Sequence, residues 1–501
     1  QRPFSTELRT RQQRIDSLDL GYEKSLYPTA HVNDGSVRYD LFYLFQSGGH
    51  MKKQPNIIVC MCDQLRAFEV GCYGNETIRT PHIDRLAQEG VRFDLAVSNN
   101  PVCMPARSAL LTGQYSRTCM GQLGNYAEAS GLPEYPAQER QWLRDTTLPE
   151  ALRAQGYDTA LFGKWHVQPA PHLVGFDHAH FPRVHHRHTG QTFIENTGEG
   201  DLVDGFSIDF EAERVGEYLA EEREDPFFMF YNISPPHMPL ADAPEKYLEM
   251  YDPQEIPLRP NTLIDGQLAY DENWFKIYLW DFLYYQQHLP HTEQLPAGFD
   301  LSQLTALYYG LTTWVDDTVG RLMANLRAQS LAEDTIVVFV SDHGDNLGSH
   351  HQFNKSLLIE ESIRVPMIFW GGLDPQANTA QVAELIDVMP TLLQCCDVDV
   401  PATVQGQSLA PILRGEQQTL AQNGAFIETD KGAIGLRTPT HLYGIQLQED
   451  RRAISDIGSC LYDLEADPYQ QKNLAGISQQ SLEEELAQQL REWNTSTPWL
   501  V

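Results

Sequence analysis

The sequence lacks any apolar run of the roughly 18 residues needed to cross a bilayer, so a membrane partner is not expected. It is also poor in positive charge, because 36 lysines and arginines stand against 68 aspartates and glutamates, for a formal charge of −32. A nucleic-acid partner would require a basic face and is excluded. An anionic ligand would therefore need a local cationic pocket.

Cysteine is sparse too, with eight residues in 501, which excludes a disulfide-dense scaffold. The neighbours Cys60/Cys62 and Cys395/Cys396 resemble reduced core cysteines and favour a cytoplasmic, bacterial-type protein. No signal-peptide core follows Met51, because the apolar run at 57–62 is too short and suits a strand. A periplasmic location is left open.

The chain divides into three predicted parts. Residues 47–51 read Ser-Gly-Gly-His-Met, which resembles a protease-site and cloning scar. We therefore expect residues 1–50 to be a vector-derived leader, with a natural N-terminal arm as the alternative. A catalytic α/β domain is expected over 51–400, and a smaller α+β domain over 401–501, where turn-rich sequence and shorter strands begin.

Apolar runs and helical patterns alternate along the predicted catalytic domain. Strands are expected at 56–62, 159–162, 226–232, 335–340 and 366–370, and helices at 81–90, 148–156, 209–224 and 304–331, with a last amphipathic helix near 482–493. This alternation predicts a largely parallel sheet with helices on both faces. Such sheets bind ligands beyond the carboxyl ends of their strands.

Acidic and amide side chains follow two of these strands. Asp63 and Gln64 follow the first, and Asp342 and His343 follow the fourth. Two carboxylates and an amide oxygen suit Ca²⁺ or Mg²⁺, and an imidazole also accepts Mn²⁺ or Zn²⁺. Either aspartate alone would be explained as a cap, but together they predict a shared metal. For Asp345 a loop-capping role is favoured over ligation.

Cationic and imidazole side chains gather at the same predicted edge. Arg107, Lys164 and Lys355 could hold a tetrahedral oxyanion, although surface ion pairs are the usual fate of such residues. His166 and His237 could act as general acid or base, with structural roles as the alternative.

A short helix is expected from Cys103 to the residue before Gly113, because Pro105 suits a first helical turn and glycine a helix end. Cys103 would then lie at the helix N-terminus beside unpaired N–H groups. It could be a nucleophile, a metal ligand or a packed core residue. Arg107, four residues later, would share its face.

Three other features are given less specific interpretations. Asp316-Asp317 lies in a helical pattern and is expected to be solvated or capping. The histidine-rich segment 172–188 has no clear ligand spacing and is interpreted as a rim loop that recognises substrate. The aromatic stretch 273–288 could stack on a sugar or aryl ring, or serve core packing or an oligomer contact.

The signature Cys103-x-Pro105-x-Arg107 followed by Thr112-Gly113 resembles that of the sulfatase family, which has the alkaline-phosphatase-like fold. Further similar segments follow in family order: "GKWH" at 163–166, "PPHMPL" at 235–240, "SDHGDNLGSH" at 341–350, "NKS" at 354–356, "EESIRVPMI" at 360–368 and "LYDLEADPYQQKNLA" at 461–475. The resemblance implies a mostly parallel central sheet flanked by helices, with a small C-terminal antiparallel sheet.

The resemblance also implies that a maturation enzyme oxidises Cys103 to formylglycine, which is hydrated to a diol. One hydroxyl would attack sulfur and displace the alcohol, and the second would expel sulfate. One divalent metal, usually calcium, with Mg²⁺ or Mn²⁺ as alternatives, would be bound by Asp63, Gln64, Asp342 and His343 beside the modified Cys103.

The remaining roles are likewise carried over from the family. Arg107 would steady the formylglycine and the metal carboxylates, while Lys164 and Lys355 would bind the sulfate oxygens. His166 would hold the diol, and His237 would protonate the leaving alcohol.

Gln64 and His343 depart from many members, which have Asp and Asn there. These departures keep a phosphonate or phosphate ester hydrolase as the alternative to a sulfatase acting on a carbohydrate or small-molecule sulfate. A non-catalytic sulfoglycan-binding protein with unmodified Cys103 is a third possibility. A homo-oligomer is compatible with the sequence.

Overall fold

The computed structural model describes residues 31–33, 36–38, 54–125, 137–183, 186–195, 198–264, 267–268, 299–448, 453, 455 and 458–500. Within residues 1–50, β1 (His31–Asn33) pairs antiparallel with β2 (Ser36–Arg38). The rest of the predicted leader lies outside the described residues, as does the aromatic stretch 273–288. Residues 51–501 form a separate compact unit.

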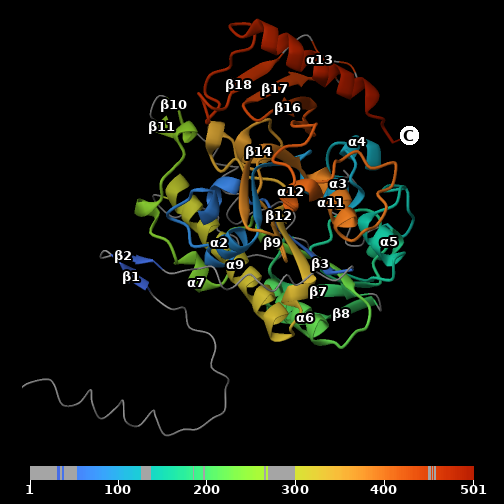
Figure 1. Cartoon of the computed structure of the whole chain (residues 1–501). Helices are drawn as coiled ribbons and strands as arrows, with labels where there is room; N and C mark the ends of the chain where they lie inside the picture. Colours follow the sequence, from blue (N-terminus) through green and yellow to red (C-terminus); the bar gives the residue numbers. More distant parts are fainter. Residues whose placement is uncertain are drawn as a thin grey trace, which may run out of the picture. The chain divides into compact units, whose positions relative to one another are not determined.

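Ten strands form the central sheet of this unit (Figure 1). In spatial order they are β14 (Gln376–Glu384), β4 (Val91–Val97), β13 (Met367–Trp370), β12 (Thr335–Ser341), β3 (Asn56–Asp63), β9 (Phe227–Pro236), β5 (Asp158–Gly163), β6 (His178–Pro182), β7 (Thr189–Glu195) and β8 (Gly198–Phe206). The run from β12 to β6 is parallel, whereas β13, β7 and β8 pair antiparallel with their neighbours. The predicted strands are confirmed, and the prediction of a largely parallel sheet holds for its centre.

Strand β3 illustrates why the central strands are apolar along their whole length. Its side chains alternate between two cores, with Ile57, Val59 and Met61 in one and Ile58, Cys60 and Cys62 in the other. Because helices cover both faces, neither set of side chains meets water, and the strand sequence shows no polar alternation.

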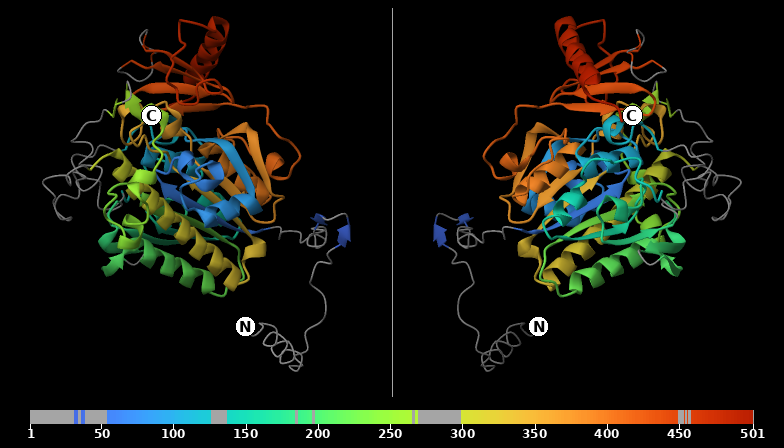
Figure 2. Two further views of the ribbon diagram at one scale, coloured as in Figure 1. Left: turned by 90° about the vertical axis from the view of Figure 1, so that its left-hand side faces the viewer. Right: turned by 90° about the vertical axis from the view of Figure 1, so that its right-hand side faces the viewer.

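Helices cover the two faces of the sheet (Figures 1 and 2). The β3 face bearing Ile58 packs against α2 (Pro81–Glu89), α6 (Ser207–Ala220) and α9 (Leu301–Ala328). The opposite face packs against α3 (Cys103–Thr112), α5 (Leu148–Arg153), α11 (Val388–Cys395) and α12 (Ala410–Leu413). Capping boxes begin two of them, Thr147 with Glu150 at α5 and Asp300 with Gln303 at α9. The shorter segments are α4 (Ser116–Cys119), α7 (Glu245–Leu248), α10 (Glu360–Ile363), β10 (Leu263–Ile264) and β11 (Gln267–Leu268).

The C-terminal region forms a second, antiparallel sheet, as expected. Its order is β15 (Ala425–Glu428), β16 (Ala433–Arg437), β17 (His441–Gln446) and β18 (Cys460–Asp463). Helix α13 (Gln480–Ser496) packs Leu486, Leu490 and Trp493 against this sheet. A domain boundary near residue 400 stays a prediction.

Two expectations drawn from the composition, on membrane-spanning segments and on cysteines, can be compared with the described residues. None of their helices is both long and apolar enough to span a bilayer. The eight cysteines all lie within the described residues and form no disulfide, and five of them are buried, including Cys60, Cys62 and Cys396. The expectation of unpaired core cysteines is thus confirmed for these three.

Candidate active site

The parallel strands bring the predicted site residues to one edge of the sheet. Asp63 ends β3, and Asp342 follows β12, which pairs with β3 in register up to Ser341 opposite Cys62. Lys164 follows β5 and His237 follows β9, which lies between β5 and β3. Neighbouring parallel strands that end together place their next residues side by side, so residues far apart in sequence share one pocket.

Cys103 is the first residue of α3, as its sequence predicts. The helix ends at Gly113, whose φ of 63° is the left-handed conformation that glycine adopts readily. The Cys103 Sγ lies 2.8 Å from Lys355 Nζ, 3.3 Å from His343 Nε2 and 3.8 Å from Asp63 Oδ1. With an exposed fraction of 1%, the thiol faces a cation and two candidate metal ligands inside the protein.

A candidate metal centre surrounds this thiol. Ligand atoms of Asp63, Cys103, Asp342 and His343 all lie within 4.8 Å of one another. The His343 Nδ1–H donates to the Gly344 carbonyl over 2.8 Å, which leaves the Nε2 lone pair directed at the cluster. This tautomer is the one that binding of a metal through Nε2 requires.

Gln64 is oriented by its neighbours. Its Nε2 donates to Asp345 Oδ2 over 2.6 Å, so its Oε1 is the atom near Lys355 Nζ, at 3.1 Å. The amide therefore presents an oxygen, the donor that a hard cation prefers. Asp345 Oδ1 also accepts from the Leu347 N–H over 2.7 Å, which confirms the expected loop-capping role.

Arg107 bridges the carboxylates of Asp63 and Asp342. Its Nη2 lies 2.9 Å from Asp63 Oδ2 and 3.0 Å from Asp342 Oδ2, and its Nη1 donates to Asn232 Oδ1 over 2.7 Å. All of these side chains are fully buried. Sequence reasoning missed Asn232, although a polar residue ending the apolar run "FFMFYN" was an available signal.

Burial and neighbouring charges shift the pKa values of the acidic and basic groups in the pocket. Burial favours the neutral form of Asp63, but Lys164, His237 and Arg107 outweigh burial and hold the pKa of its carboxyl well below the usual range. Burial and the nearby Asp63 raise the pKa of Asp342. Burial lowers the pKa of Lys164, whose Nζ contacts Asp63 Oδ2 directly. A bound cation would favour the ionised form of both aspartates.

Three imidazoles line the side of the pocket next to the lysines. The His237 Nδ1–H donates to the Met238 carbonyl over 2.6 Å, and its Nε2 lies 3.3 Å from Lys355 Nζ. His186 stacks on His237, with ring centroids 3.8 Å apart, and lies nearly perpendicular to His166, with ring centroids 5.4 Å apart. His166 is buried and has a left-handed φ of 37°.

The histidine-rich segment does not act as one unit. His186 enters the pocket, whereas His188 donates from its Nδ1–H to the Asp242 carbonyl over 2.7 Å. His172 and His178 are exposed. The segment was interpreted as a rim loop, but His186 could not be singled out, because nothing in the sequence pattern shows which ring turns inward.

Two other features lie away from this pocket. Asp316 Oδ1 accepts from the N–H groups of His82 and Ile83 at the start of α2, over 3.0 and 2.8 Å, which confirms the capping role expected for it.

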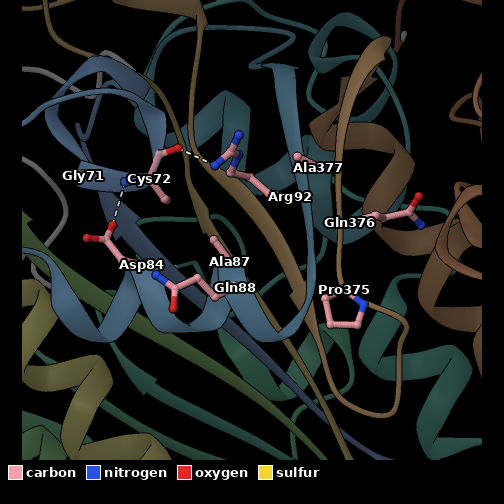
Figure 3. A pocket seen from close by; sticks show the side chains of 9 residues that line it. All are labelled: Gly71, Cys72, Asp84, Ala87, Gln88, Arg92, Pro375, Gln376 and Ala377. Carbon is pink, nitrogen blue, oxygen red and sulfur yellow. Dashed lines mark hydrogen bonds between the residues drawn. The ribbon is translucent and has the colours of Figure 1, made fainter. Parts of the chain in front are cut away.

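A separate hollow of about 470 Å³ includes Cys72, Arg92 and Gln376 among its lining residues (Figure 3). It adjoins the amino-terminal ends of β4 and β14, the opposite edge of the sheet from Asp63.

Several curated proteins are similar to this chain along most of its length. An ulvan-active sulfatase from Formosa agariphila is 29% identical over 84% of this chain and 77% of its own length. An N-acetylglucosamine-6-O-sulfatase from Bacteroides thetaiotaomicron is 27% identical over 88% of this chain and 86% of its own length.

Solved structures share the fold. A protein in complex with its substrate D-glucosamine-2-N,6-O-disulfate aligns with a TM-score of 0.71 and 25% identity, over 88% of this chain and 98% of that chain. The phosphonate monoester hydrolase of Agrobacterium radiobacter aligns with a TM-score of 0.64 and 22% identity, over 89% and 96%. At that identity the second likeness shows the fold alone.

Family profiles cover nearly all of the chain after residue 54. The profile of the N-sulphoglucosamine sulphohydrolase C-terminal region matches residues 348–496, and the sulfatase profile matches residues 55–398. The sulfatase family implies a metal ion and a formylglycine, and the cluster around Cys103 is a candidate site for the metal. Because its profile spans more than half of the sequence, the chain belongs to the sulfatase family and is, as expected, a sulfuric ester hydrolase with the alkaline-phosphatase-like fold.

Proposed function

We propose that this chain hydrolyses the O-sulfate monoester of a carbohydrate or another small molecule, with a nucleophile formed from Cys103. The observation that carries the proposal is the place of its Sγ, 2.8 Å from Lys355 Nζ and 3.8 Å from Asp63 Oδ1. An atom there can meet an anionic ester between a cation and the metal ligands. A relative that acts on N-acetylglucosamine 6-O-sulfate and a neighbour bound to a sulfated glucosamine support a saccharide substrate.

The donor set fits a divalent metal. Asp63, Asp342 and Gln64 would supply oxygens, which suit Ca²⁺ or Mg²⁺, and the His343 nitrogen would also be accepted by Mn²⁺. A bound cation would polarise the sulfate oxygens and favour ionisation of a nearby hydroxyl. Arg107 would keep the two carboxylates in place, since it contacts both.

The lysines and histidines have separable roles in this proposal. Lys164 and Lys355 would bind sulfuryl oxygens, and His166 would hold the oxygen substituents of the modified Cys103. His237 would protonate the leaving oxygen. Because its Nδ1–H is committed to the Met238 carbonyl, the proton must come from Nε2, the atom that faces the pocket near Lys355.

Mass spectrometry and a substrate comparison test this function. Conversion of a thiol to an aldehyde should lower the mass of the Cys103 peptide by about 18 Da in protein made alongside a maturation enzyme. That protein should hydrolyse 4-nitrophenyl sulfate, whereas Cys103→Ala should fold and be inactive. An unmodified thiol would favour a sulfoglycan-binding protein, and a preference for phenylphosphonate esters would favour a phosphonate hydrolase.

A panel of sulfated mono- and disaccharides would then identify the substrate. We expect release of inorganic sulfate from at least one of them, with N-acetylglucosamine 6-sulfate as the first candidate because of the relative named above. The maturation enzyme as a partner, a cytoplasmic location and a homo-oligomer are further parts of the proposal.

A further inference from the structure

His186 lies among the residues proposed to act on the ester. It belongs to the connection between β6 and β7 and has an exposed fraction of 2%. Its ring stacks on the ring of His237, lies near the Nζ of Lys164 and is nearly perpendicular to the ring of His166. These contacts place His186 beside both a proposed sulfate-binding lysine and the proposed general acid.

The contact with His237 is face to face. The two ring centroids are 3.8 Å apart and the ring planes are 12° from parallel. Within its own plane, His237 is held at Nδ1 by the Met238 carbonyl and meets Lys355 at Nε2. The stacked His186 ring blocks a tilt of the His237 ring toward it.

The contact with Lys164 shows which form of His186 is present. An ammonium group only donates, and both His186 nitrogens lie near it, Nδ1 at 3.2 Å and Nε2 at 3.5 Å, so the ring nitrogen that carries no proton can accept from Lys164. Burial and the neighbouring His237 and Lys164 hold the pKa of His186 well below its usual range. A neutral His186 is neither a third cation for sulfate nor the group that delivers a proton.

We propose that His186 is a positioning residue for the leaving-group side of the reaction. Its stacked face keeps the His237 Nε2 aimed at the leaving oxygen, and its ring nitrogen accepts the hydrogen bond that directs the Lys164 ammonium. The inference rests on the proposed sulfatase function and assigns His186 a part in it that acts through these two residues.

This role predicts a particular dependence on the substrate. Esters of weakly acidic alcohols need a proton as they leave, whereas strongly acidic phenols depart as anions. Loss of the stack should therefore steepen the dependence of kcat/KM on leaving-group acidity. A residue that only supports the fold would lower the rates of all substrates alike.

The test is a series of aryl sulfates, from 4-nitrophenyl to unsubstituted phenyl sulfate, with protein whose Cys103 is modified. His186→Ala should lose about 10²-fold in kcat/KM on phenyl sulfate and only about threefold on 4-nitrophenyl sulfate. His186→Phe keeps the stacked face without the acceptor, so it should keep the wild-type slope and raise KM. His186→Asn keeps an acceptor near the position of Nδ1 without the ring, so it should share the steeper slope.

His180 provides a matched control. It is a buried histidine of β6 that stacks on Phe193, with centroids 4.5 Å apart and planes 9° from parallel, and its other ring neighbours are Phe162 and Phe210. His180→Phe should change neither the slope nor KM, although it also replaces a stacked imidazole.

The outcomes separate the inference from the function on which it rests. A uniform loss across the series in His186→Ala, or a slope in His186→Phe as steep as in His186→Ala, overturns the inference. If His186→Ala does not fold, the comparison of the Phe and Asn variants decides, and equal slopes refute the role. Failure of the modified wild-type protein to release sulfate from any ester of the series and from any member of the saccharide panel overturns the proposed function itself.

Discussion

Replacing Arg117 by methionine should destabilise the attachment of the C-terminal sheet to the helix that follows α3. Arg117 Nε lies 2.6 Å from Glu428 Oε2 on β15, and both side chains are fully buried. Its Nη1 donates to Asn494 Oδ1 over 2.7 Å, and its guanidinium lies 4.4 Å from the Trp493 ring centroid and 4.9 Å from that of Trp499. One cation thus connects α4, β15 and the end of the chain.

The magnitude follows from what the substitution leaves behind. Removing one partner of a buried ion pair costs about 3–5 kcal/mol, because the other charge stays in the interior without compensation. Two cation–π contacts add about 0.5–2 kcal/mol each. Methionine retains the packing of the side-chain stem, and these terms are not additive, so we expect a loss of about 4–6 kcal/mol in the free energy of unfolding.

Urea unfolding followed by tryptophan fluorescence measures this loss. In Arg117→Met/Glu428→Gln the unpaired charge is gone, so the double variant should lose only about 2 kcal/mol. Arg153→Met is the control, because Arg153 and Asp177 form an exposed pair at 3.4 Å that should contribute less than about 1 kcal/mol. A loss of about 1 kcal/mol in Arg117→Met, or a double variant worse than the single one, would refute the reasoning.

Three further predictions concern the site and the response to pH. Lys355→Met should lower kcat/KM for 4-nitrophenyl sulfate by about 10²- to 10³-fold with an unchanged melting curve, and a loss of only about threefold would contradict a role at the sulfuryl oxygens. Chelation and dialysis should abolish turnover, with Ca²⁺ restoring more than Mg²⁺ or Mn²⁺, and full activity of the metal-free protein would remove the metal from the proposal. Burial raises the pKa of Asp316 to about 7, so the folded state binds the proton of this carboxyl more tightly than the unfolded chain does. The free energy of unfolding should therefore fall as pH rises from about 4 to about 7. Asp316→Asn should flatten that part of the curve of urea midpoint against pH, and an unchanged curve would show that Asp316 is ionised in the fold.

Much of the fold could be predicted because the central strands are buried on both faces. Runs such as 56–62 and 335–340 are almost wholly apolar, and the polar residues that follow them, Asp63 and Asp342, fall at one edge of the sheet for geometric reasons. Strand β4 was not predicted, since Arg92 and Asp94 interrupt its apolar residues and pair with each other.

The pocket was less predictable where side-chain direction decides. Asn232 ends an apolar run and looks like an ordinary strand end, yet it accepts a hydrogen bond from Arg107. His186 and His188 are two residues apart, but one enters the pocket and the other packs by Asp242. Periodicity gives the face of a strand or helix, whereas the direction of a loop side chain depends on contacts with distant segments.

The complete burial of α3 constrains when Cys103 can be modified relative to folding. All ten residues from Cys103 to Thr112 are buried, and Leu110 and Leu111 lie in the core beside β3. An enzyme that oxidises Cys103 could not reach it once this helix has docked. The proposed conversion must then precede folding, and chains that fold first would be well ordered, stable and permanently inert.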